Sequence, residues 1–193
     1  NRINETRVFT FSLDTMMNRQ ELAQKIYEIS HLTGEFLLRS GKISNEYFDK
    51  YRFEAQPLVL EAIAEHMAAL IPADTEIIAG LEMGGIPIVT ALSLRTGIPA
   101  AFVRKKAKAY GTCRVAEGTD LRNKKVLIIE DVITSGGQVV LSAADIRGDG
   151  GNIIGCLCVI DRQQGGSEAL LQDKIALSPL FTMTELKQAA NAV

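Results

Sequence analysis

Residues 126–137, reading VLIIEDVITSGG, have the residue types and spacing best suited to chemistry in this chain. Four aliphatic residues lead into Glu130 and Asp131, and a turn of hydroxyls and glycines follows at 134–137. Carboxylates accept hydrogen bonds from sugar hydroxyls and bind divalent cations, whereas free backbone N–H groups at the start of a helix bind phosphate. The pattern therefore predicts a ligand that carries a phosphate close to a polyol or a metal ion.

A buried strand and a helix are needed to position these groups. The aliphatic run 126–129 is typical of a parallel strand covered on both faces, and in open α/β sheets ligands bind beyond the carboxyl ends of such strands. A helix at about 138–147 would direct its N-terminal N–H groups and its dipole at the phosphate. A Walker A loop is excluded because no Gly-Lys-Ser/Thr follows the glycines, and the dinucleotide fingerprint is absent. An ordinary turn with an unused acid pair is the alternative, although adjacent acids ending an aliphatic strand are costly unless used.

A second glycine-rich turn has the same setting. The sequence GLEMGGIPI at 80–88 lies between a predicted strand and a predicted helix. Routine turn chemistry is the alternative for a lone pair of glycines. Two such turns after successive strands favour one site with two anion pockets, one for a phosphate and one for a pyrophosphate.

A cluster of cations begins where another predicted strand ends. Arg104, Lys105, Lys106 and Lys108 open the polar, glycine-punctuated segment 105–124. A long, weakly structured segment inside a compact domain is usually a lid or a binding loop. Cations there would neutralise a leaving pyrophosphate and close over it, whereas a solvated charged loop is the alternative.

The remaining pattern predicts an α/β fold: a doubly wound, mainly parallel central sheet flanked by helices. Short aliphatic strands alternate with helices of about ten residues, which calls for parallel strands joined by right-handed crossovers. Asn18 is a plausible N-cap for the first helix and Gly34 its stop. Strands are predicted at 35–38, 46–49, 76–80, 100–103, 126–129, 152–160 and 174–177, and further helices at 57–71, 86–96, 138–147 and 184–190, with a short one after 165–166.

Composition restricts the class of protein. With 193 residues, 47% hydrophobic and 23% charged, the chain fits one globular domain with a sizeable core. The net charge of −2 argues against nucleic acid as the main partner, and neither a membrane span nor a signal peptide is apparent. Cys113, Cys156 and Cys158 lack metal-ligand spacing and are expected to be reduced thiols in a cytoplasmic protein. Residues 1–15 are interpreted as a possible extension ahead of Met16-Met17, which is set apart from the fold.

The motif at 126–138 resembles the ribose-phosphate-binding motif of the type I phosphoribosyltransferases, whose cosubstrate is 5-phosphoribosyl 1-pyrophosphate (PRPP). The segments RKKAKAYGT at 104–112 and LLRSGKISNEYFD at 37–49 resemble, more narrowly, the orotate-using family among them. The resemblance implies a single domain at 16–193 with a small N-terminal hood at about 16–55 and a mobile catalytic loop at about 105–124. It also implies a homodimer that shares this loop between subunits, and Mg²⁺ held mainly by the substrate pyrophosphate and ribose hydroxyls, with no direct protein ligand.

The resemblance also assigns roles to individual residues. Lys108, Glu130 and Asp131 are the expected catalytic residues. Tyr47 and Phe48 would flank orotate, with Thr134 nearby and Arg162 pairing with the orotate carboxylate, as a planar guanidinium can through two hydrogen bonds. The residues expected to contact PRPP are Arg39, Arg104, Lys105, Lys108, Tyr110, Glu130, Asp131, Val132, Ile133, Thr134, Ser135, Gly136, Gly137 and Gln138.

Three positions depart from the family pattern. Tyr110 stands where many members have histidine, Gly84 where some have lysine, and Glu130 where aspartate is more usual. The implied reaction is transfer of the phosphoribosyl group to orotate in pyrimidine biosynthesis. A related enzyme acting on a purine or on uracil is the nearer alternative, and a PRPP-sensing transcription regulator the more distant one. The negative net charge and the lack of room for a separate winged helix before the glycine turns argue against the regulator.

Overall fold

The structure, a computed structural model, describes residues 17–37, 41–105 and 115–192. Several predictions concern residues outside these ranges: the extension at 1–15, the donor contacts Arg39 and Tyr110, the loop residue Lys108 and the thiol of Cys113. The described residues include no helix that is long and apolar enough to cross a membrane.

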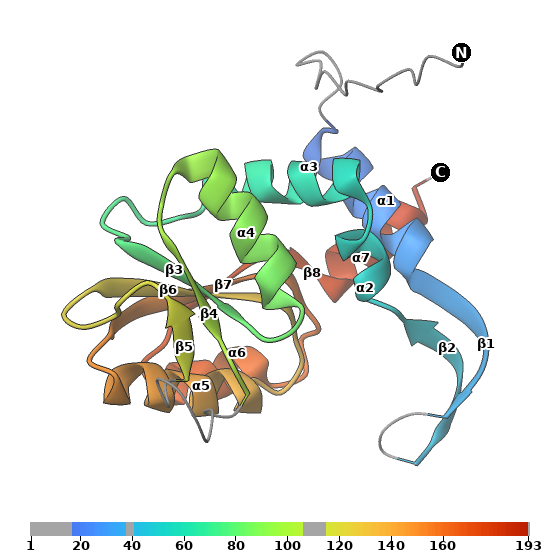
Figure 1. The fold of residues 1–193 in the computed structure, drawn as a ribbon. Coiled ribbons are helices and arrows are strands. Elements are labelled where there is room, and N and C mark those ends of the chain that lie inside the picture. The colour runs from blue at the N-terminus through green and yellow to red at the C-terminus, as the bar shows by residue number, and fades with distance from the viewer. Residues whose placement is uncertain (1–16, 38–40, 106–114, 193) are drawn as a thin grey trace, which may run out of the picture.

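A six-stranded sheet forms the centre of the molecule, in the order β5-β4-β3-β6-β7-β8 (Figure 1). All neighbouring strands are parallel except β5, which pairs antiparallel with β4. The strands are β3 (Ile77–Leu81), β4 (Ala100–Val103), β5 (Ala116–Gly118), β6 (Lys125–Ile133), β7 (Asn152–Asp161) and β8 (Leu177–Thr182).

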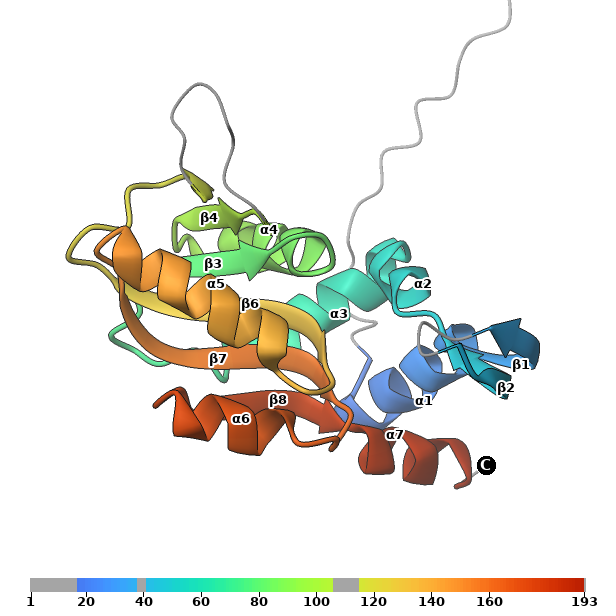
Figure 2. The same cartoon turned by 90° about the horizontal axis from the view of Figure 1, so that it is seen from below.

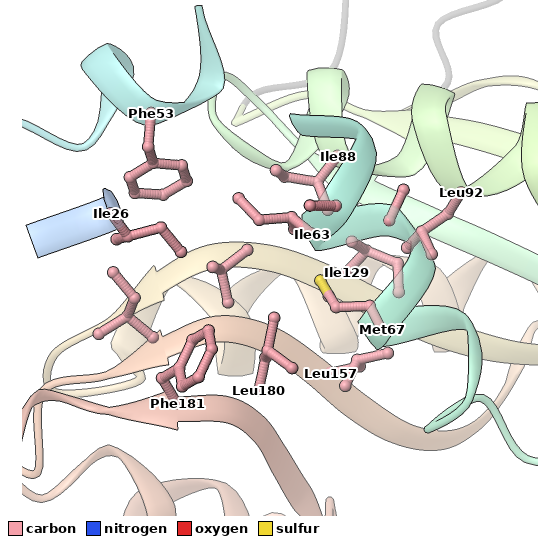
Figure 3. Close-up of a cluster of buried hydrophobic side chains, with 14 of the residues drawn as sticks. Ile26, Phe53, Ile63, Met67, Ile88, Leu92, Ile129, Leu157, Leu180 and Phe181 are labelled. Carbon is pink, nitrogen blue, oxygen red and sulfur yellow. The ribbon is translucent and has the colours of Figure 1, made fainter. Parts of the chain in front are cut away.

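Helices cover both faces of this sheet, as the predicted doubly wound fold requires. Helices α3 (Pro57–Ala68) and α4 (Gly85–Thr96) lie on one face, and α5 (Gly137–Gly148) and α6 (Gly166–Gln172) on the other (Figures 1 and 2). Each face has its own buried apolar cluster because alternate residues of a strand point to opposite sides. Figure 3 shows the larger cluster, in which side chains from helices and from the central strands interdigitate. Its labelled members are Ile26, Phe53, Ile63, Met67, Ile88, Leu92, Ile129, Leu157, Leu180 and Phe181.

The N-terminal region is a helix followed by a separate antiparallel hairpin. It comprises α1 (Arg19–Ser30), β1 (His31–Leu37), β2 (Ile43–Phe48) and the single turn α2 (Tyr51–Glu54). The hairpin projects from the body beside α1 (Figures 1 and 2). The C-terminal helix α7 (Met183–Ala190) packs against α1, where Arg19 donates hydrogen bonds to the Leu180 carbonyl and to Glu185, each at 2.8 Å.

Several elements differ from the prediction, four of them in ways that matter for the fold. Asn18 caps α1 in a full capping box, but the helix ends at Ser30, because the residues up to Gly34 and beyond pair with β2 instead. Strand β6 continues through both acids to Ile133. The segment predicted as a loop at 105–124 contains β5. The last strand lies at Leu177–Thr182, whereas the prediction was 174–177.

Both cysteines within the described residues are buried and unpaired on β7, as predicted. Cys156 and Cys158 point into the same apolar cluster, and burial raises the pKa of both thiols. They are therefore core residues and not reactive ones.

Candidate active site

The two acids of the central motif lie near the carboxyl end of β6, beside the end of β3. Asp131 is completely buried, and its Oδ1 accepts a hydrogen bond from the Val132 N–H at 2.6 Å. Its Oδ2 lies 2.7 Å from Nζ of Lys50, a residue that sequence reasoning did not single out. Glu130 is partly exposed, although its Oε2 is buried without a hydrogen-bond partner among the described residues. Lys50, from the N-terminal region, thus places a cation beside the acid pair.

A third carboxyl group, that of Glu54 in α2, completes this cluster. Burial and its contact with Asp131 raise the pKa of Glu54 to about 9, so it is protonated at neutral pH. Burial and the charge of Asp131 raise the pKa of Glu130 well above its usual value. Burial alone would raise the pKa of Asp131 as well, but the Glu54 hydrogen bond and the Lys50 charge outweigh it and lower that pKa. Asp131 is therefore the carboxyl that holds the negative charge.

The turn after β6 has the form expected of a phosphate cradle. Gly136 adopts a left-handed conformation (φ 75°) as the N-cap of α5, and a side chain there would overlap Leu170. Thr134, Ser135, Gly137 and Gln138 are exposed next to the helix N-terminus, where free N–H groups attract anions.

Two residues predicted to contact the donor belong to the core in this structure. The side chain of Ile133 is buried under α5, and that of Val132 packs against the opposite apolar cluster. One backbone group of each is also engaged: the Val132 N–H donates to Oδ1 of Asp131 at 2.6 Å, and the Ile133 carbonyl accepts from the Arg162 N–H at 2.9 Å. Contact of these two residues with the donor stays a prediction, and the exposed residues of the turn begin at Thr134.

The second glycine turn lies directly beside Asp131. Gly84 has no room for a side chain, because a Cβ there would overlap Oδ2 of Asp131. A Cβ at Gly85 would come within 2.6 Å of the carbonyl oxygen of Ile129. The turn also contains a cis peptide between Glu82 and Met83. The two turns therefore meet at the carboxyl ends of the neighbouring strands β3 and β6, as the sequence predicted.

Two of the predicted cations lie at the end of β4, next to this turn. The Lys105 N–H donates to Oε2 of Glu82 at 3.0 Å, which ties the start of the cationic segment to the turn. The Arg104 guanidinium lies 3.4 Å from Glu117 on β5. Both residues are thus at the same edge of the sheet as the acid pair.

A pocket of about 270 Å³ brings together three of the four residues predicted to bind the acceptor, and Thr134 is not among those that line it. Tyr47 and Phe48 enter it from β2, and Arg162 enters it from the end of β7. The Nε of Arg162 is buried and makes no hydrogen bond with the described residues. Sequence reasoning missed the other lining residues, Tyr27, His31, Ser44, Glu46, Gln164, Met183 and Lys187.

A network of contacts shapes one wall of this pocket. The His31 ring stacks on Tyr27 with centroids 4.8 Å apart, and its Nε2 lies 2.9 Å from Glu46. The His31 hydrogen bond, and then the charges of Lys187 and Arg162, lower the pKa of Glu46. The pocket thus combines aromatic faces with two cations, which suits a flat anionic ligand.

The fold, the acid pair beside the phosphate turn and the acceptor pocket are those expected of a phosphoribosyltransferase, and comparison with known proteins confirms this class. Residues 52–182 match the phosphoribosyl transferase domain. An orotate phosphoribosyltransferase from Nocardioides sp. (strain ATCC BAA-499 / JS614) is 46% identical over 89% of this chain and 96% of its own length. One from Methanopyrus kandleri is 37% identical over 92% of this chain and 96% of its own length.

Solved structures agree with these relatives. The orotate phosphoribosyltransferase of Mycobacterium tuberculosis H37Rv, in a complex with Fe(III) dicitrate, superposes with a TM-score of 0.80 at 30% identity, covering 87% of this chain and 98% of that one. The same enzyme in a complex with PRPP gives a TM-score of 0.76 at 26% identity, covering 88% and 98%. The chain belongs to the orotate phosphoribosyltransferase family.

Proposed function

We propose that this chain transfers the phosphoribosyl group from PRPP to orotate, giving orotidine 5′-monophosphate and pyrophosphate in pyrimidine biosynthesis. The observation that carries the proposal is the pocket in which Tyr47, Phe48 and Arg162 converge. The backbone N–H of Arg162 also donates to the carbonyl of Ile133, just before the phosphate turn. The residues for orotate and those for PRPP are therefore adjacent. The family of the chain supports the same reaction.

The donor, PRPP, binds at the carboxyl ends of β3 and β6, between the two glycine-rich turns. Its 5′-phosphate lies on the exposed N–H groups and hydroxyls of Thr134 and Ser135, and its ribose hydroxyls donate to Glu130 and Asp131. The positive charge that develops on the ribose ring is favoured by the negative charge of Asp131. Arg104 and Lys105 face the pyrophosphate, with Arg39, Lys108 and Tyr110 as the further contacts that the family resemblance implies.

The acceptor is held for attack on the anomeric carbon. Arg162 pairs with the orotate carboxylate while Tyr47 and Phe48 contact its ring. The ring nitrogen gives up its proton to solvent and forms the new bond to the anomeric carbon as the bond from that carbon to pyrophosphate breaks, and the electron pair leaves with the pyrophosphate. Because orotate is already an anion with an acidic ring N–H, neutralising the leaving group matters more than a strong base. Lys108 is assigned this task.

We propose that Mg²⁺ is held mainly by the pyrophosphate and the ribose hydroxyls of the substrate, as the family resemblance implies. Within the described residues, no group of three His, Cys, Asp or Glu side chains is arranged to hold a metal ion. The carboxylate best placed for one, that of Asp131, already contacts Lys50 and the Val132 N–H. Bound to the pyrophosphate and the ribose hydroxyls, Mg²⁺ would neutralise charge on the leaving group.

Acceptor specificity is tested with four compounds in parallel. With Mg²⁺ and PRPP, ultraviolet absorbance is followed for orotate, uracil, adenine and hypoxanthine. We expect turnover with orotate alone, because its carboxylate is the group that Arg162 can pair with. Turnover confined to uracil or to a purine would refute the acceptor assignment.

The proposal includes a cytoplasmic homodimer in which the loop of each subunit reaches the active site of the other. Two large apolar side chains, Leu37 and Ile43, are exposed on the hairpin, and further ones occur at Leu58 and Leu94. Exposed apolar groups of this kind are suited to contact between subunits. Sedimentation equilibrium of the whole chain is expected to give the mass of a dimer, and a monomer across the concentrations used for assay would contradict a shared active site.

A further inference from the structure

Lys50 and Glu54 approach the active-site acid Asp131 from outside the central sheet. Both belong to the short segment that links the hairpin to α3, at and just before the single turn α2 (Figure 2). The Lys50 Nζ lies 2.7 Å from Oδ2 of Asp131, and Glu54 is buried against the same carboxylate. None of the roles assigned above to donor or acceptor binding accounts for these two side chains.

We propose that Lys50 and Glu54 are positioning residues of the donor site, which together hold the Asp131 carboxylate charged and in place for the ribose hydroxyls. The inference rests on the proposed function, because that function makes Asp131 a ligand of the ribose. Neither side chain needs to touch the substrate for this role.

The burial of Asp131 explains why it needs both partners. Its side chain is 0% exposed, and a buried carboxylate is stable only when a cation or hydrogen-bond donors compensate it. Lys50 provides the cation, and since its own side chain is 32% exposed, it remains hydrated on the other side. Burial alone would lower the pKa of Lys50, but the charge of Asp131 outweighs this and raises it, so the pair is ionic.

Glu54 acts through its neutral form. Because its pKa is raised to about 9, it carries a proton at neutral pH and can donate it in a hydrogen bond to Asp131. An ionised Glu54 in this position would instead repel both neighbouring acids. Lys50 thus places a cation against Asp131, and the buried, protonated Glu54 adds no second negative charge beside it.

The packing of Gly84 against Asp131 explains why the cation, Lys50, comes from the link segment and not from the glycine turn. The glycine turn faces Asp131 from β3, but any side chain at position 84 would overlap Oδ2. Position 84 therefore cannot hold a cationic side chain, because it would overlap the carboxylate. Lys50 reaches Oδ2 of Asp131 from the link segment instead.

The experiment compares Lys50→Met with Lys50→Arg, and Glu54→Leu with Glu54→Gln. Lys25→Met is the matched control, because Lys25 forms an exposed ion pair with Glu28 on α1. PRPP affinity is measured by calorimetry without orotate, and Michaelis constants for both substrates are measured across pH. Thermal unfolding of each variant monitors folding.

Lys50→Met is expected to weaken PRPP binding by about tenfold to a hundredfold, the cost of one unpaired buried group, while the orotate Michaelis constant stays at its wild-type value. The acid limb of the pH profile of kcat/KM for PRPP should move to higher pH, because Lys50 no longer lowers the pKa of Asp131. Lys50→Arg should restore most of the affinity. Glu54→Gln, whose amide still donates, should behave far better than Glu54→Leu.

Two results would overturn the inference. One is wild-type PRPP affinity in Lys50→Met; the other is an equal loss for both substrates with an unmoved acid limb, which indicates a purely structural role. If Lys50→Met fails to fold, the comparison of Glu54→Gln with Glu54→Leu decides. If the wild-type chain binds PRPP but uses an acceptor other than orotate, the proposed acceptor fails while the PRPP measurements still test Lys50 and Glu54.

Discussion

Replacing Gly84 by alanine adds a single methyl group at the most crowded point of the donor site. The new Cβ would overlap Oδ2 of Asp131, the atom that Lys50 also contacts at 2.7 Å. Either the turn or the carboxylate has to shift, and Asp131 is completely buried. Overpacking of this kind costs about 1–3 kcal/mol of folding free energy. Displacement of Asp131 should in addition weaken PRPP binding.

Gly148→Ala is the matched control for this substitution. Gly148 ends α5, has no neighbour within 4 Å of its would-be Cβ and has no positive φ. Alanine there should be neutral, or stabilising by up to about 1 kcal/mol, because it is the better helix former. Urea unfolding gives the free energies, and steady-state kinetics give the PRPP Michaelis constant. Equal stability and equal PRPP Michaelis constants in the two variants would refute the placement of Gly84 against Asp131.

Three further predictions concern the cationic loop, the subunit arrangement and pH. Lys108→Ala should lower kcat far more than it raises the PRPP Michaelis constant, because a group that neutralises the leaving pyrophosphate acts mainly in the transition state; an unchanged kcat in the steady-state assay would contradict this. Mixing inactive Lys108→Ala and Asp131→Asn subunits should restore activity through dimers with one intact site, and no recovery after subunit exchange would exclude a shared loop. The folded-state pKa of Glu54, about 9, lies above its unfolded value, so its stabilising contribution is complete below about pH 4.5 and is lost as pH rises through 9. The stability of Glu54→Gln relative to wild type should therefore increase from pH 5 to pH 8. A constant difference in urea unfolding at the two pH values would show that Glu54 is ionised when folded.

Local sequence pattern was sufficient to predict the parts of the site that belong to one stretch of chain. The acids at 130 and 131, the turn at 134–137 and the helix after it follow one another in sequence, so their relation needed no tertiary information. Arg162 also follows an aliphatic strand, but its assignment to the acceptor came from the family resemblance. The parallel order of the strands brings these ends together.

The residues that sequence reasoning missed act across long separations in the chain. Lys50 meets Asp131 only because the link after the hairpin folds over the end of β6, which no periodic pattern records. Glu54 lies in a single helical turn, and an acid there reads as an ordinary exposed residue, whereas it is buried. A lysine two residues after the aromatic pair was the one available signal.

The wrong element boundaries have equally physical causes. Strand β5 has three residues, fewer than an alternating pattern needs to be recognised. Strand β8 contains Pro179, which argues against a strand in general but is tolerated here because β8 is at the edge of the sheet. Gly34 was interpreted as a helix stop, but it lies within β1.

The Michaelis constants for orotate and PRPP in the wild-type chain and in Arg162→Ala test the central claim most directly. The absorbance of orotate is followed with Mg²⁺ and PRPP present. We expect that the wild-type chain consumes orotate and that loss of the guanidinium raises the orotate Michaelis constant by about tenfold or more, as removal of a charged hydrogen-bonding partner does, while the PRPP Michaelis constant is unchanged. No consumption of orotate by the wild-type chain, or an effect of Arg162→Ala confined to PRPP, would contradict it.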